Sequence, residues 1–387
     1  MNKQKDLFFY MSYDIYLIVY IIETSFYAKY LISLNKIIIF ICLSLLMINE
    51  IANKRISNKK ISYKEITLFA ICLVGTFMMR KNYNGGTLFL LFFFIYEARN
   101  IELKKIVKCT YKISAILLIF IIASSKAGII PNYISKVEGR KRQYIGFTYA
   151  LYPSMIMFHI TACFAYLKEN KIKLYNIIIL CICNYVIYRY TESRLSFGLS
   201  IILLVIAYLL PRLKVLKSKE ILNILVVSFL ICTIFSYAFT LNYNGNSEFY
   251  RNIDKKLNYR LYWGNNYISQ HRITLFGNGE QFVGAGLNYD GTQSVGKYNY
   301  VDNFYLNIMI KYGIIYLILY LAMNTYCLIL CKKQKNIILM YILAMYAVHG
   351  IIDDLMINLY YNCFELAIGR VIMIEVINRQ KKKLNRG

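Results

Sequence analysis

The sequence predicts an all-α, polytopic integral membrane protein with about 12 transmembrane helices and one long external loop. Three observations predict this fold class. Of 387 residues, 58% are hydrophobic, and the mean hydropathy is +0.45. Only 3 prolines are present, and Ile, Leu, Phe and Tyr gather in long apolar runs. Many runs approach the roughly 20 residues that a helix needs to cross a bilayer. Helices are the expected spanning structure because they satisfy their own backbone groups.

The apolar runs divide the chain into twelve expected spans. Asp14 and Glu23 interrupt the first run and further spans follow it, so we expect a retained helix rather than a cleaved signal peptide. The fourth and fifth spans are short, and the tenth is long enough to project beyond the membrane. The expected spans are 7–23, 33–49, 65–79, 84–97, 112–124, 148–166, 173–189, 195–210, 219–240, 303–330, 336–350 and 359–378. They form a single membrane domain, 1–387.

The positions of Lys and Arg predict the orientation, because short cytoplasmic loops are enriched in these residues. With the N-terminus inside, more than half of the 46 basic residues fall in cytoplasmic segments. These segments are the N-terminus, Lys54–Lys64, Arg99–Lys112, Lys168–Lys173, Arg212–Lys219, Lys332–Lys335 and Arg379–Arg386. Both termini are therefore expected in the cytoplasm. An external basic loop, 125–147, and the long external loop, 241–302, hold more than half of the remaining basic residues.

The formal net charge of +26 does not predict nucleic-acid binding. Membrane topology accounts for most of the basic residues, and a composition rich in Lys, Ile, Asn and Tyr is typical of an AT-rich bacterial genome. No soluble basic domain is expected that could carry a nucleic-acid site. Nucleic acid is therefore not an expected partner, and the lipid bilayer is.

Cysteine and histidine do not predict a disulfide framework or a metal site. All ten cysteines lie in expected spans or at inner helix ends, and none falls in the 241–302 loop. Cys181 and Cys183 are two residues apart, so on a helix they point to different faces. We expect no ligand-like neighbours for His159. His349 lies four residues before Asp353, which is one pair and far short of a metal site.

The residues suited to chemistry lie in the external segments. In 125–147, the run Gly139-Arg140-Lys141-Arg142 could hold a phosphate through charge-assisted hydrogen bonds, or could contact anionic lipid headgroups. Glu192 and Arg194 lie between the seventh and eighth spans, where Arg194 could also be a snorkelling anchor.

The 241–302 loop combines basic and aromatic residues. It contains Arg251, Arg260 and Arg272 among many Tyr residues and the single Trp, Trp263. Aromatic faces with polar neighbours suit sugar rings. An aromatic belt at the membrane interface would explain the same composition.

The order of several short motifs from Arg194 to Tyr316 resembles the bacterial Wzy-type polysaccharide polymerases and the related O-antigen ligases. The resemblance covers about a third of the chain. Its motifs are Ser193-Arg194 before an apolar helix, then Arg260 and Trp263, Leu275-Phe276-Gly277-Asn278-Gly279, Val301-Asp302-Asn303-Phe304-Tyr305-Leu306, and Gly313; Arg142 with Gly146-Phe147 is a weaker echo. Ligases commonly have histidine before the asparagine that Asn303 matches. Asp302 stands there, which favours a polymerase.

The resemblance implies a metal-independent glycosyltransferase without a cofactor, acting outside the membrane. It would join oligosaccharide repeat units carried on undecaprenyl pyrophosphate, and its partners would include a chain-length regulator and a flippase. Arginine suits a departing pyrophosphate, so we assign Arg194 and Arg260 to it, with Arg142 and Arg272 as lesser candidates. Asp302 is the first candidate base and Glu192 the second. Trp263, Asn303 and Tyr305 are assigned to sugar binding.

Other functions fit parts of the sequence. A capping role before the tenth span would also explain Asp302. A flippase or another transporter of lipid-linked oligosaccharides would have a similar number of spans, but it predicts polar residues midway along the helices. The clearest mid-span charges are few, namely Asp14, Glu365 and Arg370. An O-antigen-type ligase and a non-catalytic scaffold are further alternatives.

Overall fold

The protein is mostly helical, with one small β-hairpin. The computed structural model describes residues 6–57, 63–79, 86–137, 139–271, 273–279, 282–293, 295–296 and 298–384. Its α-helices are α1 (Leu7–Glu23), α2 (Asn35–Ser57), α3 (Tyr63–Met79), α4 (Gly86–Ala98), α5 (Leu103–Lys126), α6 (Tyr152–Lys168), α7 (Leu174–Thr191), α8 (Arg194–Leu209), α9 (Lys219–Val226), α10 (Ser228–Leu241), α11 (Glu248–Lys256), α12 (Arg260–Gln270), α13 (Phe304–Tyr312), α14 (Ile314–Lys333), α15 (Ile337–His349) and α16 (Ala367–Leu384). The 3-10 helices are η1 (Phe26–Tyr30), η2 (Ile32–Leu34), η4 (Glu169–Lys171), η5 (Lys214–Lys217), η6 (Leu355–Ile357) and η7 (Cys363–Leu366), and the strands are β1 (Ile134–Val137) and β2 (Arg140–Gln143).

Four helical segments within the described ranges are long and apolar enough to cross a membrane. They are Ile32–Asn53, Leu103–Lys126, Leu174–Thr191 and Ile314–Lys333. α9 and α10 make a fifth candidate if they are counted together, although they are bent by 56°. Other expected spans are shorter helices, such as α15 with 13 residues. The expected count of twelve spans stays a prediction.

The sides of the helical assembly are apolar, as the composition predicts. Large side chains on α2, α5 and α7 are exposed, among them Phe40 at 71%, Ile119 at 68% and Ile182 at 56%. A water-exposed surface rarely presents apolar side chains in such numbers on neighbouring elements. These sides are therefore suited to contact with lipid.

Inside the bundle, α1 contributes a column of aromatic side chains. Phe9, Tyr13, Tyr16 and Tyr20 recur every three or four residues, which places them on one face of the helix. The rings of the first three contact Phe94 of α4, with centroid separations of 5.9, 5.5 and 5.2 Å. This packing holds α1 against α4 and sets the N-terminal half of the core.

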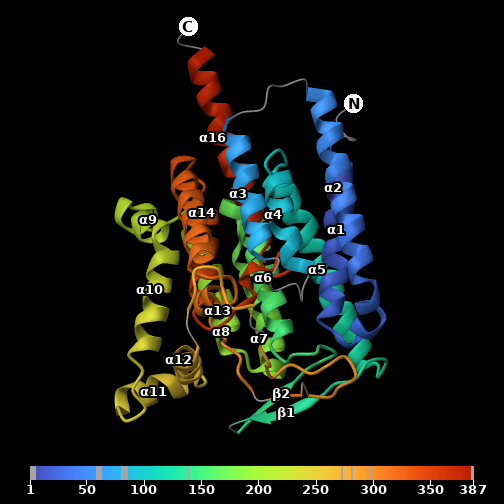
Figure 1. Cartoon of the computed structure of the whole chain (residues 1–387), viewed down its shortest axis with the longest axis vertical. Coiled ribbons are helices and arrows are strands. Elements are labelled where there is room, and N and C mark those ends of the chain that lie inside the picture. Colours follow the sequence, from blue (N-terminus) through green and yellow to red (C-terminus); the bar gives the residue numbers. More distant parts are fainter. Residues whose placement is uncertain are drawn as a thin grey trace.

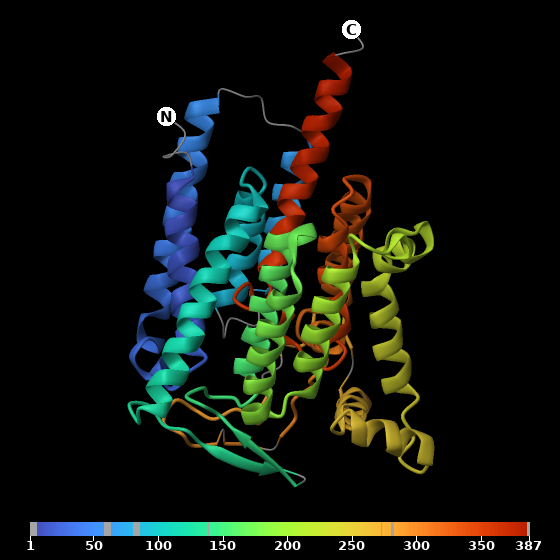
Figure 2. The same ribbon diagram turned by 180° about the vertical axis from the view of Figure 1, so that it is seen from behind.

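One end of the bundle carries the hairpin and the helices α11 and α12, opposite the C-terminal end of α16 (Figure 1). We call it the hairpin end. β1 and β2 pair antiparallel, with Ser135 opposite Arg142, which adds strands to the expected all-α architecture. Helices α9 to α12 form one edge of the molecule in both views (Figure 2). The two expected external loops therefore lie at the same end.

The fifth and tenth expected spans differ from the structure. α5 begins at Leu103, well before 112, because the Lys-containing turns before the apolar run continue the helix. The tenth span is broken into α13 and α14 at Gly313, whose φ is +94°. A Cβ there would lie 2.2 Å from the Leu275 carbonyl oxygen, and one on Gly277 would lie 2.1 Å from that of Lys311. The break admits the 274–278 segment, whose backbone pairs with both helices.

The last expected span, 359–378, is also wrong at its start. Residues 350–366 form turns and the short helices η6 and η7, and α16 begins only at Ala367. Asn362 helps to hold this segment, because its Nδ2 donates to the Met356 carbonyl and the Glu365 carboxylate. Buried polar groups of this kind stabilise irregular backbone inside an apolar bundle.

Candidate functional site

Two adjoining pockets lie at the hairpin end. The aromatic pocket, of about 520 Å³, is lined by Tyr149, Tyr152, Trp263, Tyr298 and Tyr300 together with Asp302, Asp353 and Asp354. The cationic pocket, of about 260 Å³, is lined by Arg140, Arg142, Arg194, Lys256 and Arg260 together with Glu192 and Asp353. Arg142, Asn258, Arg260 and Asp353 line both pockets. The shared walls join them into one site.

Arg260 is positioned by the turn between α11 and α12. Asn258 and Tyr259 have φ values of +54° and +61°, which reverse the chain before Arg260 begins α12. The buried Asp254 carboxylate stabilises this turn, because it accepts hydrogen bonds from the Leu261 and Tyr262 backbone amides at the start of α12. The Arg260 side chain then points toward residue 302.

Arg260 and Asp302, which are 42 residues apart in the sequence, form an ion pair. Nη2 of Arg260 lies 3.7 Å from Oδ2 of Asp302, and Nε donates to the Asp302 carbonyl at 3.3 Å. The Tyr298 hydroxyl donates to the same carboxylate at 3.3 Å. Burial raises the pKa of Asp302, and the positive charge of Arg260 opposes that rise. The side chain is still 24% exposed, so it remains accessible from the pocket.

Capping does not explain Asp302. The residue that caps α13 is Asn303, whose side-chain oxygen accepts from the Leu306 amide at 3.1 Å. The Asn303 amide group donates to the Ile351 carbonyl at 2.8 Å. The Asp302 carboxylate is therefore available to the pocket, whereas the side chain of Asn303 is used within the fold.

Arg142 is a partly buried guanidinium on β2. Its Nε is buried and has no hydrogen-bond partner in the part of the chain that the structure describes. Burial lowers the pKa of Arg142, and the charges of Arg140 and Arg260 act in the same direction, although an arginine stays protonated. A buried donor without a partner is costly, so it is typical of a position that a ligand satisfies.

Glu192 and Arg194 lie at the turn from α7 to α8. Glu192 adopts a left-handed conformation with a φ of +49°, and Arg194 is the first residue of α8. Within the described ranges, neither side chain makes a hydrogen bond or an ion pair with protein. The Ser193 hydroxyl donates to Ser196, which lies 3.4 Å from Nε2 of His349. The turn is thereby held while its two charged side chains face the cationic pocket.

Two carboxylates that the sequence did not single out for this site complete it. Asp354 accepts hydrogen bonds at Oδ2 from the Tyr300 hydroxyl, at 2.6 Å, and from Asn307, at 3.1 Å. Asp353 accepts from the Leu355 amide at 2.9 Å. Burial and the negative charge of Asp354 raise the pKa of Asp353 well above its usual range. The adjacent pair after Gly350, between the expected spans 336–350 and 359–378, was the available sequence signal.

The structure brings together six of the nine residues assigned from the sequence. Arg142, Glu192, Arg194, Arg260, Trp263 and Asp302 line one or both pockets. Trp263 packs edge-on against Tyr298, with ring centroids 4.9 Å apart. Tyr305 is buried and donates to the Ala347 carbonyl at 2.8 Å, so it and Asn303 support the fold outside the pockets. Arg272 lies outside the described residues.

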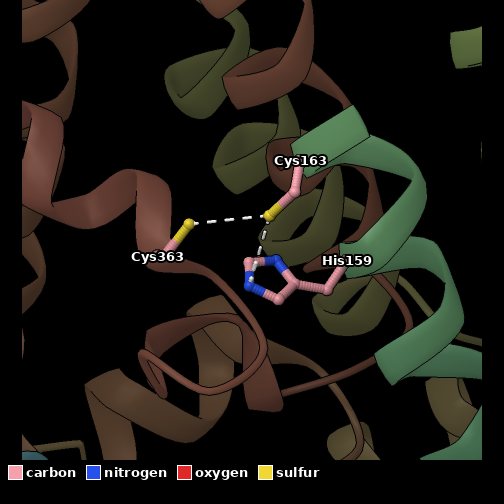
Figure 3. A group of neighbouring side chains, drawn as sticks. All are labelled: His159, Cys163 and Cys363. Carbon is pink, nitrogen blue, oxygen red and sulfur yellow. Dashed lines mark hydrogen bonds between the residues drawn. The ribbon is translucent and has the colours of Figure 1, made fainter. Parts of the chain in front are cut away.

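His159 does have ligand-like neighbours, contrary to the expectation from sequence. His159 and Cys163 are four residues apart on α6, and Cys363 of η7 approaches both (Figure 3). All three side chains are buried among the helices. The sequence could show the first pair but not Cys363, which is 200 residues from Cys163.

No protein-family model, curated protein or solved structure matches this chain. The site is therefore interpreted from its own geometry. It offers a cluster of cations for an anionic group, aromatic faces for a ring, and a carboxylate with a raised pKa between them. Such a set can bind a phosphorylated, ring-containing substrate and accept a proton from it.

Proposed function

We propose that the chain is a bacterial polysaccharide polymerase that joins undecaprenyl-pyrophosphate-linked oligosaccharide repeat units at the outer face of the cytoplasmic membrane. It would be a multi-pass protein with about 12 spans and both termini in the cytoplasm. With both termini in the cytoplasm, the hairpin end would lie outside, because it is at the opposite end of the bundle from the termini. α14 is long enough to span alone, and the shorter helices would have to reach the full membrane thickness together with their irregular neighbours.

The observation that carries the proposal is the joined pair of pockets. The cationic pocket is lined by five basic side chains, among them Arg142, whose buried Nε has no hydrogen-bond partner within the described residues. Phosphate oxygens are the natural partners of such guanidinium groups, because the planar fork donates two parallel hydrogen bonds. The aromatic pocket lies on the other side of Arg260 and presents flat faces that suit sugar rings.

The two pockets divide the reaction between them. The pyrophosphate of the donor would lie in the cationic pocket, and a terminal sugar of the acceptor would stack in the aromatic pocket. The acceptor hydroxyl oxygen then attacks the anomeric carbon of the donor, the bond from that carbon to the pyrophosphate oxygen breaks, and Asp302 receives the hydroxyl proton. Arg260 would stabilise both the charged leaving group and the Asp302 carboxylate.

A glycan size ladder tests the proposal. Cells that lack the protein are complemented with the wild type, Arg260→Ala or Arg251→Ala; Arg251 is an exposed arginine of α11 that lines neither pocket. We expect long chains with the wild type and Arg251→Ala, and single repeat units outside the membrane with Arg260→Ala. Repeat units that accumulate on the cytoplasmic side would instead identify a flippase.

A further inference from the structure

Three side chains in the helical interior form a ligand set that the proposed polymerase reaction does not use. The ligand atoms of His159, Cys163 and Cys363 all lie within 4.8 Å of one another. Sγ of Cys163 is 3.8 Å from Nε2 of His159 and 3.8 Å from Sγ of Cys363. Figure 3 shows the two sulfur atoms and the imidazole ring converging from α6 and η7.

We propose that His159, Cys163 and Cys363 bind one zinc ion. Zinc bonds of about 2.3 Å to sulfur and about 2.0 Å to nitrogen, at tetrahedral angles, separate neighbouring ligand atoms by about 3.5–3.8 Å. The separations through Cys163 are already close to this range. The His159–Cys163 pair shares one face of α6 because the residues are four apart, so only η7 must contribute the remaining sulfur.

The hydrogen bonds around His159 leave Nε2 free to bind a metal. The Tyr346 hydroxyl donates its proton to the Tyr361 carbonyl at 2.8 Å. Its oxygen must therefore accept the other hydrogen bond, 2.7 Å long, from Nδ1–H of His159. The imidazole then carries its proton on Nδ1, and the lone pair of Nε2 faces the sulfur atoms. A metal-binding histidine usually has an oriented second nitrogen of this kind.

The charge balance favours zinc over other soft cations. Zinc binding requires Cys163 and Cys363 each to release a thiol proton, so two thiolates neutralise the divalent ion and no net charge is buried. A monovalent copper ion with the same ligands would leave one negative charge uncompensated.

The ion would link the irregular 350–366 segment, through Cys363, to α6, through His159 and Cys163. That segment carries Asp353 and Asp354, which line the aromatic pocket, and α6 begins at Tyr152, which lines the same pocket. Zinc would thus stabilise the framework of the pockets without contacting the substrate. This role is compatible with a metal-independent reaction, and it does not depend on what the pockets bind.

The metal content of the full-length protein tests the inference. After purification in detergent under reducing conditions, we expect one zinc ion per wild-type chain, measured by elemental analysis. Cys163→Ala and Cys363→Ala should each lose the zinc, whereas Cys327→Ala should keep it. Cys327 is the matched control because it is also a fully buried cysteine of a helix, α14. Tyr346→Phe should weaken zinc binding about 10–100-fold, because it removes the acceptor for Nδ1–H.

A second measurement needs no variant. Cobalt added to the zinc-free wild-type chain should produce thiolate-to-cobalt charge-transfer absorption, and zinc should abolish it. Equal zinc content in the wild type and both Cys→Ala variants, or no cobalt–thiolate absorption, would overturn the inference. A Cys163–Cys363 disulfide in protein isolated under reducing conditions would also overturn it, because those sulfur atoms could not then be thiolate ligands.

Discussion

Nη2 of Arg260 and Oδ2 of Asp302 lie 3.7 Å apart; Arg260 lines both the cationic and the aromatic pocket, and Asp302 lines the aromatic pocket. Both side chains come from the long external loop, 241–302, of the predicted topology. The pair places a permanent positive charge beside a carboxylate of raised pKa. In the proposed glycosyl transfer, Arg260 would stabilise the charge of the leaving group and Asp302 would accept a proton.

The first prediction concerns Asp302 as the proton acceptor. Asp302→Asn keeps the shape of the side chain but cannot accept a proton, so polymerisation by the purified protein should fall about 10²–10⁴-fold. Because burial raises the pKa of Asp302, wild-type activity should decline as the pH falls through a value above the ordinary aspartate pKa of about 3.9. Rates are measured from the growth of chains on lipid-linked repeat units. Wild-type rates with Asp302→Asn would exclude Asp302 as the base.

The second prediction separates ligand binding from folding at Arg142. Arg142→Gln should reduce polymerisation about 10²–10³-fold, the usual effect of losing one donor to a developing charge. The melting temperature should not fall, because Nε of Arg142 has no protein partner within the described ranges. Lys141→Gln is the control, since Lys141 is exposed and points to the other face of β2. A large loss of thermal stability in Arg142→Gln would indicate a structural role instead.

The third prediction concerns the pH dependence of stability at Asp353. Burial raises its folded-state pKa, so the folded chain holds this proton more tightly than the unfolded chain. The free energy of unfolding should therefore decrease as the pH rises from about 4, the ordinary aspartate pKa, through the raised value.

Asp353→Asn should remove that part of the pH dependence and should stabilise the protein at neutral pH. Thermal unfolding in detergent across this pH range checks both effects. Asp290→Asn, in an exposed loop, should leave the decrease in place. An unchanged pH profile in Asp353→Asn would show that Asp353 is not the titrating group.

The fourth prediction concerns the break between α13 and α14. Gly313→Ala forces a Cβ to within 2.2 Å of the Leu275 carbonyl oxygen at a φ of +94°. The backbone conformation of Gly313, with φ +94° and ψ 170°, is adopted almost only by glycine and costs another residue about 1–3 kcal/mol. The clash adds to this cost, so unfolding should occur at a clearly lower temperature. Gly198→Ala is the control, because an added Cβ there meets nothing within 4 Å. Equal stability of the two variants would mean that the 274–278 segment does not pack into the break.

Much of the site was accessible from sequence because charged residues at the ends of apolar runs must gather at the ends of a bundle. Arg142, Arg194, Arg260 and Asp302 were assigned to one side on this basis, and the structure places all four around the same two pockets. Asn303 shows the limit of the approach. Its place in the motif predicted sugar binding, but the structure shows that its side chain caps α13.

The sequence alone predicted a mostly helical protein and most of its helices, because long apolar runs with few prolines favour helix over other backbone structure. Other features depend on contacts between segments that are distant in the sequence. The break at Gly313 depends on a segment some forty residues earlier in the chain. Asp353 joins the site only because 350–366 turns inside the bundle, and Cys363 meets His159 only when η7 packs on α6. Contacts between distant segments depend on how side chains pack in three dimensions, and local composition does not encode that packing.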